Sequence, residues 1–115
     1  WTADFGSAVG LAVDRQQVYV VTDRSIVVAL DKRSGGEIWR QEELKERLLS
    51  APAVLGEQIV VGDYEGHLHL LAMADGKLVG RSRLGGDGFS VAPIVVDGVM
   101  YAVERGGRVA AFQLR

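Results

Sequence analysis

The 115-residue sequence contains no cysteine, only two prolines and no excess of basic residues. Without cysteine the chain cannot form disulfides, thiolate metal sites or a cysteine nucleophile. The formal net charge of -2 lacks the basic footprint that is usual for a nucleic-acid-binding protein. No apolar run approaches the ~18 residues of a membrane-spanning helix. The remaining composition, with 48% hydrophobic residues and 15 glycines, is typical of a globular chain with many tight turns.

The sequence repeats itself without gaps at a period of 41 residues. One copy, APAVLGEQIVVGDYEGHLHLL, begins at Ala51, and a second, APIVVDGVMYAVERGGRVAAF, begins at Ala92. A third, GLAVDRQQVYVVTDRSIVVAL, begins at Gly10. A constant offset through strands and turns alike is not expected from chance similarity between apolar strands. The chain is therefore predicted to consist of repeated structural units.

Each unit is predicted to contain four short β-strands, because β-branched runs alternate with turn-forming clusters. In the middle unit we expect these strands at residues 52–55, 58–62, 67–72 and 78–84. A period near ~40 to 45 residues with four strands per unit is typical of a β-propeller blade. The predicted fold class is all-β, a partial β-propeller of four-stranded antiparallel blades.

The repeat also predicts how the blades divide the chain. Residues 1–9 are expected to supply the outer strand of a preceding blade and a connection. Two complete blades follow, and the chain ends in a three-stranded, incomplete blade; we place these three units at residues 10–50, 51–91 and 92–115.

A spaced motif, AxDxxxGxxxW, joins the third and fourth predicted strands of the first unit. Its aspartate can accept hydrogen bonds from turn amides, and its glycine permits the chain to reverse. A small alanine beside a large tryptophan would let the indole ring pack against a neighbouring blade. Trp1 is expected to be the matching tryptophan of the preceding unit. The predicted blade-docking residues are therefore Ala29, Asp31, Gly35, Trp39 and Trp1.

This motif resembles the tryptophan-docking motif of pyrroloquinoline-quinone (PQQ)-type propeller repeats. The second unit keeps Gly76 but has Gly80 where the tryptophan is expected. A closer resemblance covers the whole chain: ELKERLLSAP, VVGDYEGHLHLL, DGKLVGRSRL and GFSVAPIVVDGVMYAVERGGRVAAFQLR are similar to the C-terminal part of the BamB family of lipoproteins. That family serves the assembly of β-barrels in the bacterial outer membrane.

The resemblance implies a C-terminal portion of an eight-bladed, non-enzymatic propeller without a cofactor. It implies a scaffold on the periplasmic face of the outer membrane that binds the periplasmic domains of BamA. It also implies an N-terminal lipid anchor and upstream blades that are absent from this sequence. No BamA-binding residue can be carried over, because no position here matches one.

The strand count predicts open blade edges, and open edges favour pairing with another chain. We therefore expect self-association, in which residues 1–5 of one copy complete the last blade of another.

Two histidines, His67 and His69, lie on one face of a predicted strand near Asp63 and Glu65. A metal pair is conceivable, but imidazole sites normally use three or four ligands, so packing or solvent-facing histidines are the favoured interpretation. The glycine-rich segments GSAVG (6–10) and GGDGFS (85–90) do not follow a strand and open a helix, so they are interpreted as connections between blades. The segment ERGGR (104–108) aligns with the turn DYEGH and is predicted to form a hairpin.

One segment, QEELKERLL (41–49), has helical character and is predicted to form a helical insertion of one or two turns. Local packing is the favoured interpretation. The alternative is a partner-facing loop, because irregular insertions on a rigid scaffold often bind partners. Its weak candidates for partner binding are Leu44, Arg47 and Leu48.

Three functions therefore stay open, and no catalytic or metal site is assigned. The first is a non-catalytic scaffold of the BamB type. The second is a fragment of a PQQ-dependent dehydrogenase propeller, which would need cofactor and calcium ligands gathered from many blades. The third is a propeller adaptor elsewhere in the cell. Upstream sequence would separate them, because a lipid-modified cysteine favours the first and adjacent cysteines with acidic metal ligands favour the second.

Overall fold

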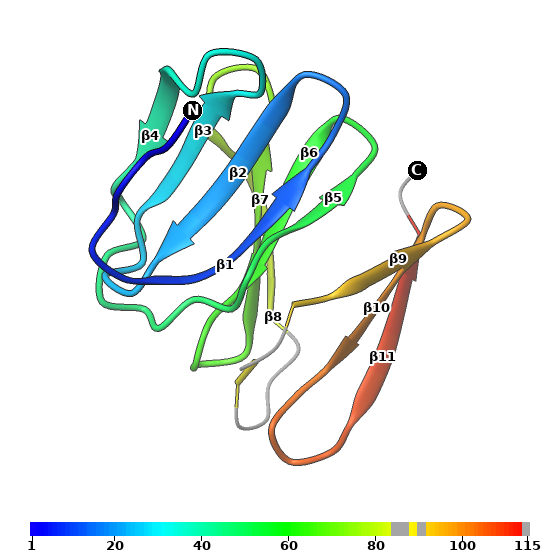
Figure 1. The fold of residues 1–115 in the computed structure, drawn as a ribbon. Helices are drawn as coiled ribbons and strands as arrows, with labels where there is room; N and C mark the ends of the chain where they lie inside the picture. The colour runs from blue at the N-terminus through cyan, green and yellow to red at the C-terminus, as the bar shows by residue number, and fades with distance from the viewer. Residues whose placement is uncertain (84–87, 90–91, 114–115) are drawn as a thin grey trace.

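The computed structural model describes residues 1–83, 88–89 and 92–113, and within them the chain is all β-structure arranged as three antiparallel sheets (Figure 1). The first sheet contains β1 (Ala8–Val13), β2 (Gln17–Thr22), β3 (Val27–Asp31) and β4 (Glu37–Gln41). The second contains β5 (Ala53–Leu55), β6 (Gln58–Gly62), β7 (His67–Ala72) and β8 (Leu78–Arg83). The third contains β9 (Ile94–Val96), β10 (Val99–Val103) and β11 (Val109–Gln113). No helix able to cross a membrane occurs in these ranges.

The strands of each sheet follow one another in chain order, as short turns require. The all-β prediction is confirmed, and the middle strands begin or end within one residue of their expected positions where the structure describes them. Residue 84, predicted as the end of a strand, lies outside the described residues, as does most of the glycine-rich segment 85–90. The predicted hairpin at 104–108 is confirmed by backbone hydrogen bonds between Glu104 and both Gly107 and Arg108.

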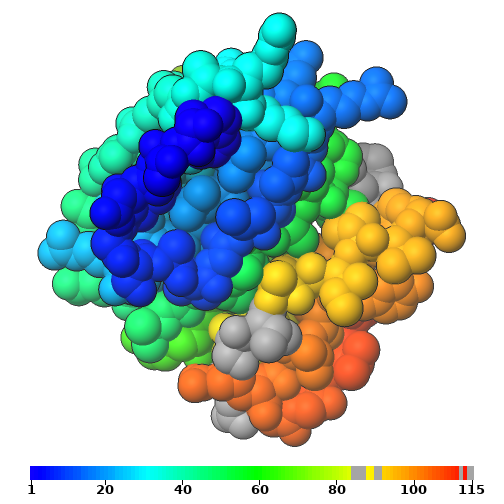
Figure 2. Space-filling model, viewed as in Figure 1, coloured from blue at the N-terminus to red at the C-terminus, as the bar shows by residue number. Residues whose placement is uncertain are grey.

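The N-terminal segment, residues 1–7, forms no strand and crosses the outer face of the first sheet (Figures 1 and 2). Phe5 packs there against the cluster of Val20, Val28 and Leu30. Beside this segment β1 leaves Leu11 60% exposed. The expectation that residues 1–5 belong to a preceding blade stays a prediction, and so does pairing of β11, an outermost strand of its sheet, with another copy.

The middle sheet is buried on both faces because it lies between the other two sheets (Figure 1). Along β6 the side chains of Ile59 and Val61 pack toward the first sheet, while Val60 packs toward the third. Successive strand residues point to opposite faces, so an apolar run such as IVV suits a strand that is covered on both sides. This double burial makes the middle sheet the centre of the core.

The predicted helical insertion at 41–49 is wrong, because the structure has consecutive turns there. The backbone amide of Arg47 donates to the carbonyl of Leu44, which is a bond of three-residue spacing. Glu46 and Leu48 adopt positive φ angles of 66° and 49°, which end any right-handed helix. As a result Leu44 and Leu49 turn into the core, whereas Leu48 stays 62% exposed.

A tryptophan joins the first sheet to the second. Trp39, at the middle of β4, lies opposite Ala29 and packs its ring over Gly76, in the turn between β7 and β8. Its indole Nε1 donates to the carbonyl of Met73 at 2.9 Å. The nearby side-chain amide of Gln41 donates to the carbonyl of Gly76 at 2.9 Å. The two bonds and the ring contact fix the second sheet against the edge of the first.

The contact predicts a strong effect of a single methyl group. A Cβ atom at Gly76 would overlap the Trp39 ring, and φ at this residue is +76°. We expect Gly76→Ala to lower the free energy of unfolding by about 2–4 kcal/mol, combining overpacking with backbone strain. Gly98→Ala is the matched control, because φ is +78° and nothing lies within 4 Å of its Cβ position; it should cost about 1 kcal/mol. Urea unfolding followed by fluorescence measures both, and equal losses would contradict the docking role of Trp39.

Candidate functional site

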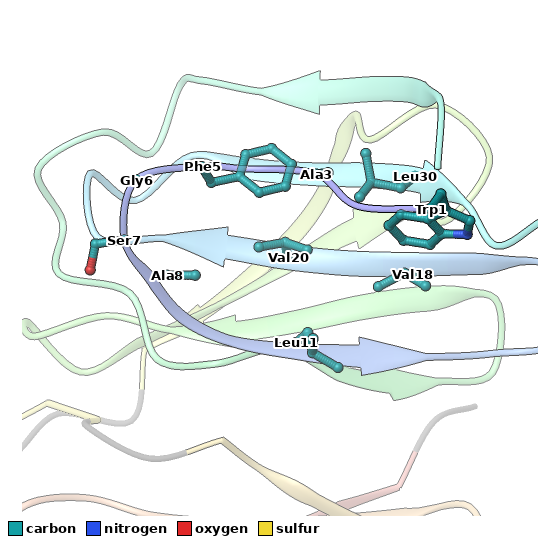
Figure 3. A pocket seen from close by; sticks show the side chains of 10 residues that line it. All are labelled: Trp1, Ala3, Phe5, Gly6, Ser7, Ala8, Leu11, Val18, Val20 and Leu30. Carbon is teal, nitrogen blue, oxygen red and sulfur yellow. The ribbon is translucent and has the colours of Figure 1, made fainter. Parts of the chain in front are cut away.

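The first docking turn repeats the geometry at Trp39 one period earlier. The Nε1 of Trp1 donates to the carbonyl of Lys32 at 2.8 Å, and Lys32 lies 41 residues before Met73. A Cβ at Gly35 would lie 2.6 Å from the Trp1 ring, as its counterpart at Gly76 would overlap Trp39. Figure 3 shows Trp1 over the first sheet, near Leu30 and Val18. Trp1 is 58% exposed, so this contact covers only part of the ring.

The turn itself is held by Asp31. Its Oδ1 accepts backbone N–H bonds from Arg33 at 2.8 Å and from Ser34 at 3.0 Å. Both bonds lower the pKa of Asp31 below its ordinary value, and the bond from Ser34 has the larger effect. Gly35 takes φ = 78° and donates its N–H to the carbonyl of Asp31. Asp31 and Gly35 thus form the turn between β3 and β4 against which Trp1 packs, and Trp39, opposite Ala29, packs on the corresponding turn of the second sheet.

The second sheet has no tryptophan at the corresponding position, Gly80, and another aromatic contact occurs instead. Phe89 is buried between the second and third sheets, against Gly62 of β6. A Cβ at Gly62 would lie 2.6 Å from Cβ of Phe89. The sequence analysis missed this contact, because Phe89 lies in a glycine-rich segment that was interpreted only as a connection.

A buried cluster of charged and polar groups lies where the 42–50 connection crosses the second sheet. At its centre is Asp63, which is fully buried at the end of β6. The Oδ1 of Asp63 accepts the backbone amides of Glu65 and His67 at 2.9 and 3.0 Å. Its Oδ2 lies 2.7 Å from Nε2 of His69 and 3.5 Å from Nη1 of Arg47. A carboxylate can only accept, so Nε2 of His69 carries the proton.

The two histidines occupy different surroundings. His69 is 2% exposed and hydrogen-bonded to Asp63, whereas Nδ1 of His67 is 3.5 Å from Oδ2 of Asp63 without forming a hydrogen bond. Within the described ranges no three metal-type side chains are grouped closely enough to hold an ion. In this cluster His69 is packed inside and bonded to the carboxylate, and His67 lies beside it.

Burial and hydrogen bonding set the protonation states of this cluster. Burial lowers the pKa of His69 below 6.5, although the hydrogen bond to Asp63 opposes that shift. Burial alone would raise the pKa of Asp63, but the hydrogen bonds from His69 and from the amides of His67 and Glu65 outweigh it and lower the pKa below 3.8. The stable arrangement near neutral pH is a neutral imidazole donating to an ionised carboxylate.

The three candidate residues for partner binding differ in how far the structure exposes them. Leu44 lies in the core and is 2% exposed. Arg47 is partly exposed and reaches toward Asp63, and Leu48 points outward. Leu48 lines a surface groove of about 600 Å³ together with Tyr64 and charged residues of the turn after β2. Partner binding by Arg47 and Leu48 stays a prediction.

The cluster predicts a dependence of stability on pH. Both pKa values are lowered by folding, so the unfolded chain takes up protons more readily, and stability is lost as the pH falls. The loss begins below 6.5, where unfolded His69 protonates, and continues below 3.8 through Asp63. We expect His69→Gln to lose about 2 kcal/mol of unfolding free energy at neutral pH. It should also lose less additional stability than the wild type between about pH 7.5 and about pH 5. Urea unfolding at both values tests this, and an unchanged decline in the variant would contradict it.

The comparisons with known proteins agree with this architecture. The family described as "Outer membrane protein assembly factor BamB" matches residues 23–115. The protein of that name from Pseudomonas aeruginosa is 41% identical over the whole of this chain and 30% of its own length. The chain thus spans less than a third of the length of such curated relatives.

Solved structures give the same picture of the fold. The crystal structure of BamB from Moraxella catarrhalis matches 91% of this chain and 32% of its own, with a TM-score of 0.85 and 28% identity. A quinohemoprotein alcohol dehydrogenase from Pseudomonas putida matches 98% of this chain and 20% of its own, with a TM-score of 0.79 but 23% identity, which shows a shared fold alone. From the sequence match over most of its length, together with propeller-type sheets, the chain belongs to the family of the outer membrane protein assembly factor BamB.

Proposed function

We propose that this chain is a section of a non-catalytic propeller scaffold that acts in outer membrane protein assembly. The observation that carries the proposal is the 41% identity to an assembly factor over all 115 residues. The match covers all 115 residues, so it includes the turns and connections as well as the strands. The rigid sheets would hold the connections in fixed positions for protein partners.

The finer features of the proposal concern the partner and the location. The periplasmic domains of BamA are the proposed partner of the longer protein. We place that protein at the periplasmic face of the outer membrane, attached through an N-terminal lipid anchor. These statements rest on family membership, and the partly exposed Arg47 and exposed Leu48 supply the contact surface that we propose for this section.

A dehydrogenase fragment is the less supported alternative. Its support is the structural likeness to quinohemoprotein dehydrogenases, and the identity of 23–24% with two of them is low. Such a likeness is expected wherever propeller blades of this type occur, because one fold carries many functions.

The proposal predicts that this chain can replace the matching section of a relative. In the Pseudomonas aeruginosa factor, the aligned 30% would be exchanged for residues 1–115, and the chimera expressed in a strain that lacks the factor. We expect outer membrane protein levels to return to at least about half of those with the intact factor, because most blade contacts are local. Immunoblots of outer membrane fractions measure the result.

A chimera carrying Gly76→Ala controls for the integrity of the blades, since that change disturbs the contact with Trp39. If the unmodified chimera accumulates in the periplasm at normal levels yet restores no outer membrane protein, the scaffold proposal is contradicted. Binding of PQQ with calcium by the purified chain would favour the dehydrogenase alternative.

A further inference from the structure

A groove of about 440 Å³ opens on the outer side of the second sheet, beside the Asp63 cluster. It lies between the turns of the 42–50 connection and the outermost strand, β8. We call it the β8 groove; its lining residues are Glu43, Leu44, Arg47, His69, Leu78, Gly80 and Arg81. Every residue of β8 is exposed, so this side of the sheet is open to a partner.

The side chains that line the β8 groove include two arginines and one glutamate, in a chain whose formal net charge is -2, and the buried Asp63 lies behind Arg47 at 3.5 Å. Arg47 and Arg81 line it from opposite sides, with Glu43 as its acidic residue. Arg83 adds a further cation on the same face of β8, since residues two apart in a strand point the same way. The register confirms this placement, because Arg81 pairs with His69 and Arg83 with His67.

Both groove arginines keep capacity to bind an anion. Arg47 makes one ion pair, at 3.5 Å to Asp63, and a guanidinium has five N–H donors, so donors remain for a ligand. The side chain of Arg81 is exposed and makes no hydrogen bond or ion pair with any residue that the structure describes. Planar arginine groups bind carboxylates through paired hydrogen bonds, which gives both strength and direction.

Apolar surface adjoins these cations. Leu78 is 38% exposed at the groove, and the buried Leu44 closes its inner side. A ligand that fits would place a carboxylate between Arg47 and Arg81 and an apolar group against Leu78. The negative charge of Glu43 in the same groove disfavours a broad anionic membrane surface more than a protein segment that carries a single carboxylate.

We propose that the β8 groove binds a protein segment in which a glutamate or aspartate is next to an apolar residue. This inference rests on the proposed function, because a scaffold in protein assembly has protein partners. To that function it adds the position of a partner-binding site on this section and the residue types that a bound segment would carry.

The probe is the blocked peptide acetyl-Leu-Glu-Leu-Glu-amide, with acetyl-Leu-Gln-Leu-Gln-amide as its uncharged match. Titration of the isotopically labelled full chain, followed by NMR, should shift backbone amides at 43–47 and 78–83 with the glutamate peptide. The glutamine peptide and Arg81→Gln should each raise the dissociation constant about tenfold, since each removes a charge-assisted pair. Arg15→Gln, which changes an exposed arginine in the turn after β1, should leave it unchanged.

A second variant keeps the proposal testable if Arg81→Gln has a small effect. Arg81→Glu should abolish binding of the glutamate peptide and permit binding of acetyl-Leu-Lys-Leu-Lys-amide. Equal binding of the glutamate and glutamine peptides, or an equal loss in Arg15→Gln, would overturn the proposal. Arg81-dependent binding to phosphatidylglycerol vesicles without peptide binding would also overturn it, in favour of a lipid surface. These are direct binding measurements, so their failure would leave the result of the chimera experiment unaffected.

Discussion

The carboxylate of Asp63 is the point on which the centre of the structure depends. One of its oxygens holds the turn between β6 and β7, through the amides of Glu65 and His67. The other holds His69 within the core and faces Arg47 of the connection from the first sheet. A buried charge without such partners would be costly, so the carboxylate fixes the turn, the strand and the connection together. The backbone carbonyl of Asp63 also accepts a hydrogen bond from the amide of Phe89, so the segment that leads to the third sheet is held at the same residue.

The same turn recurs in all three sheets with different side chains. In the first sheet Thr22 takes the place of Asp63, and its hydroxyl accepts the amides of Arg24 and Ile26. Each turn also binds the segment that enters its own sheet through a backbone hydrogen bond. The three donor–acceptor pairs are Asp23 to Ser7, Tyr64 to Arg47 and Arg105 to Gly88. Because the entering segment is held by backbone groups, its side chains are free to differ between blades. At this position the middle blade has the charged Asp63 with its network, and the first blade has the neutral hydroxyl of Thr22.

The strands and the first docking motif could be predicted from sequence because both depend on local rules. Alternating turn clusters and β-branched runs define strands wherever neighbouring strands are close in the chain. The turn at Asp31 likewise depends on residues within six positions of one another. The connection at 41–49 could not be predicted in this way. Its leucines have helical spacing, but the two that are buried in the core, Leu44 and Leu49, are five residues apart. The positive φ angles of Glu46 and Leu48 turn the backbone so that both side chains can reach the core.

The sequence analysis noticed the histidines but missed the residue that organises them. His67 and His69 stood out because imidazoles can bind metals, whereas Asp63 was noted only as an acidic residue near them in the sequence. Its contact with Arg47, which is 16 residues away in the sequence, is made by the connection from the first sheet, where Glu46 and Leu48 have positive φ angles. Backbone strain of this kind is kept where the surrounding structure determines it strongly. Here the strained connection places Arg47 between the buried carboxylate of Asp63 and the β8 groove. The packing of the core therefore also determines a charge at the surface. A change in the core at Asp63 would then alter what the groove can bind, without touching any exposed residue.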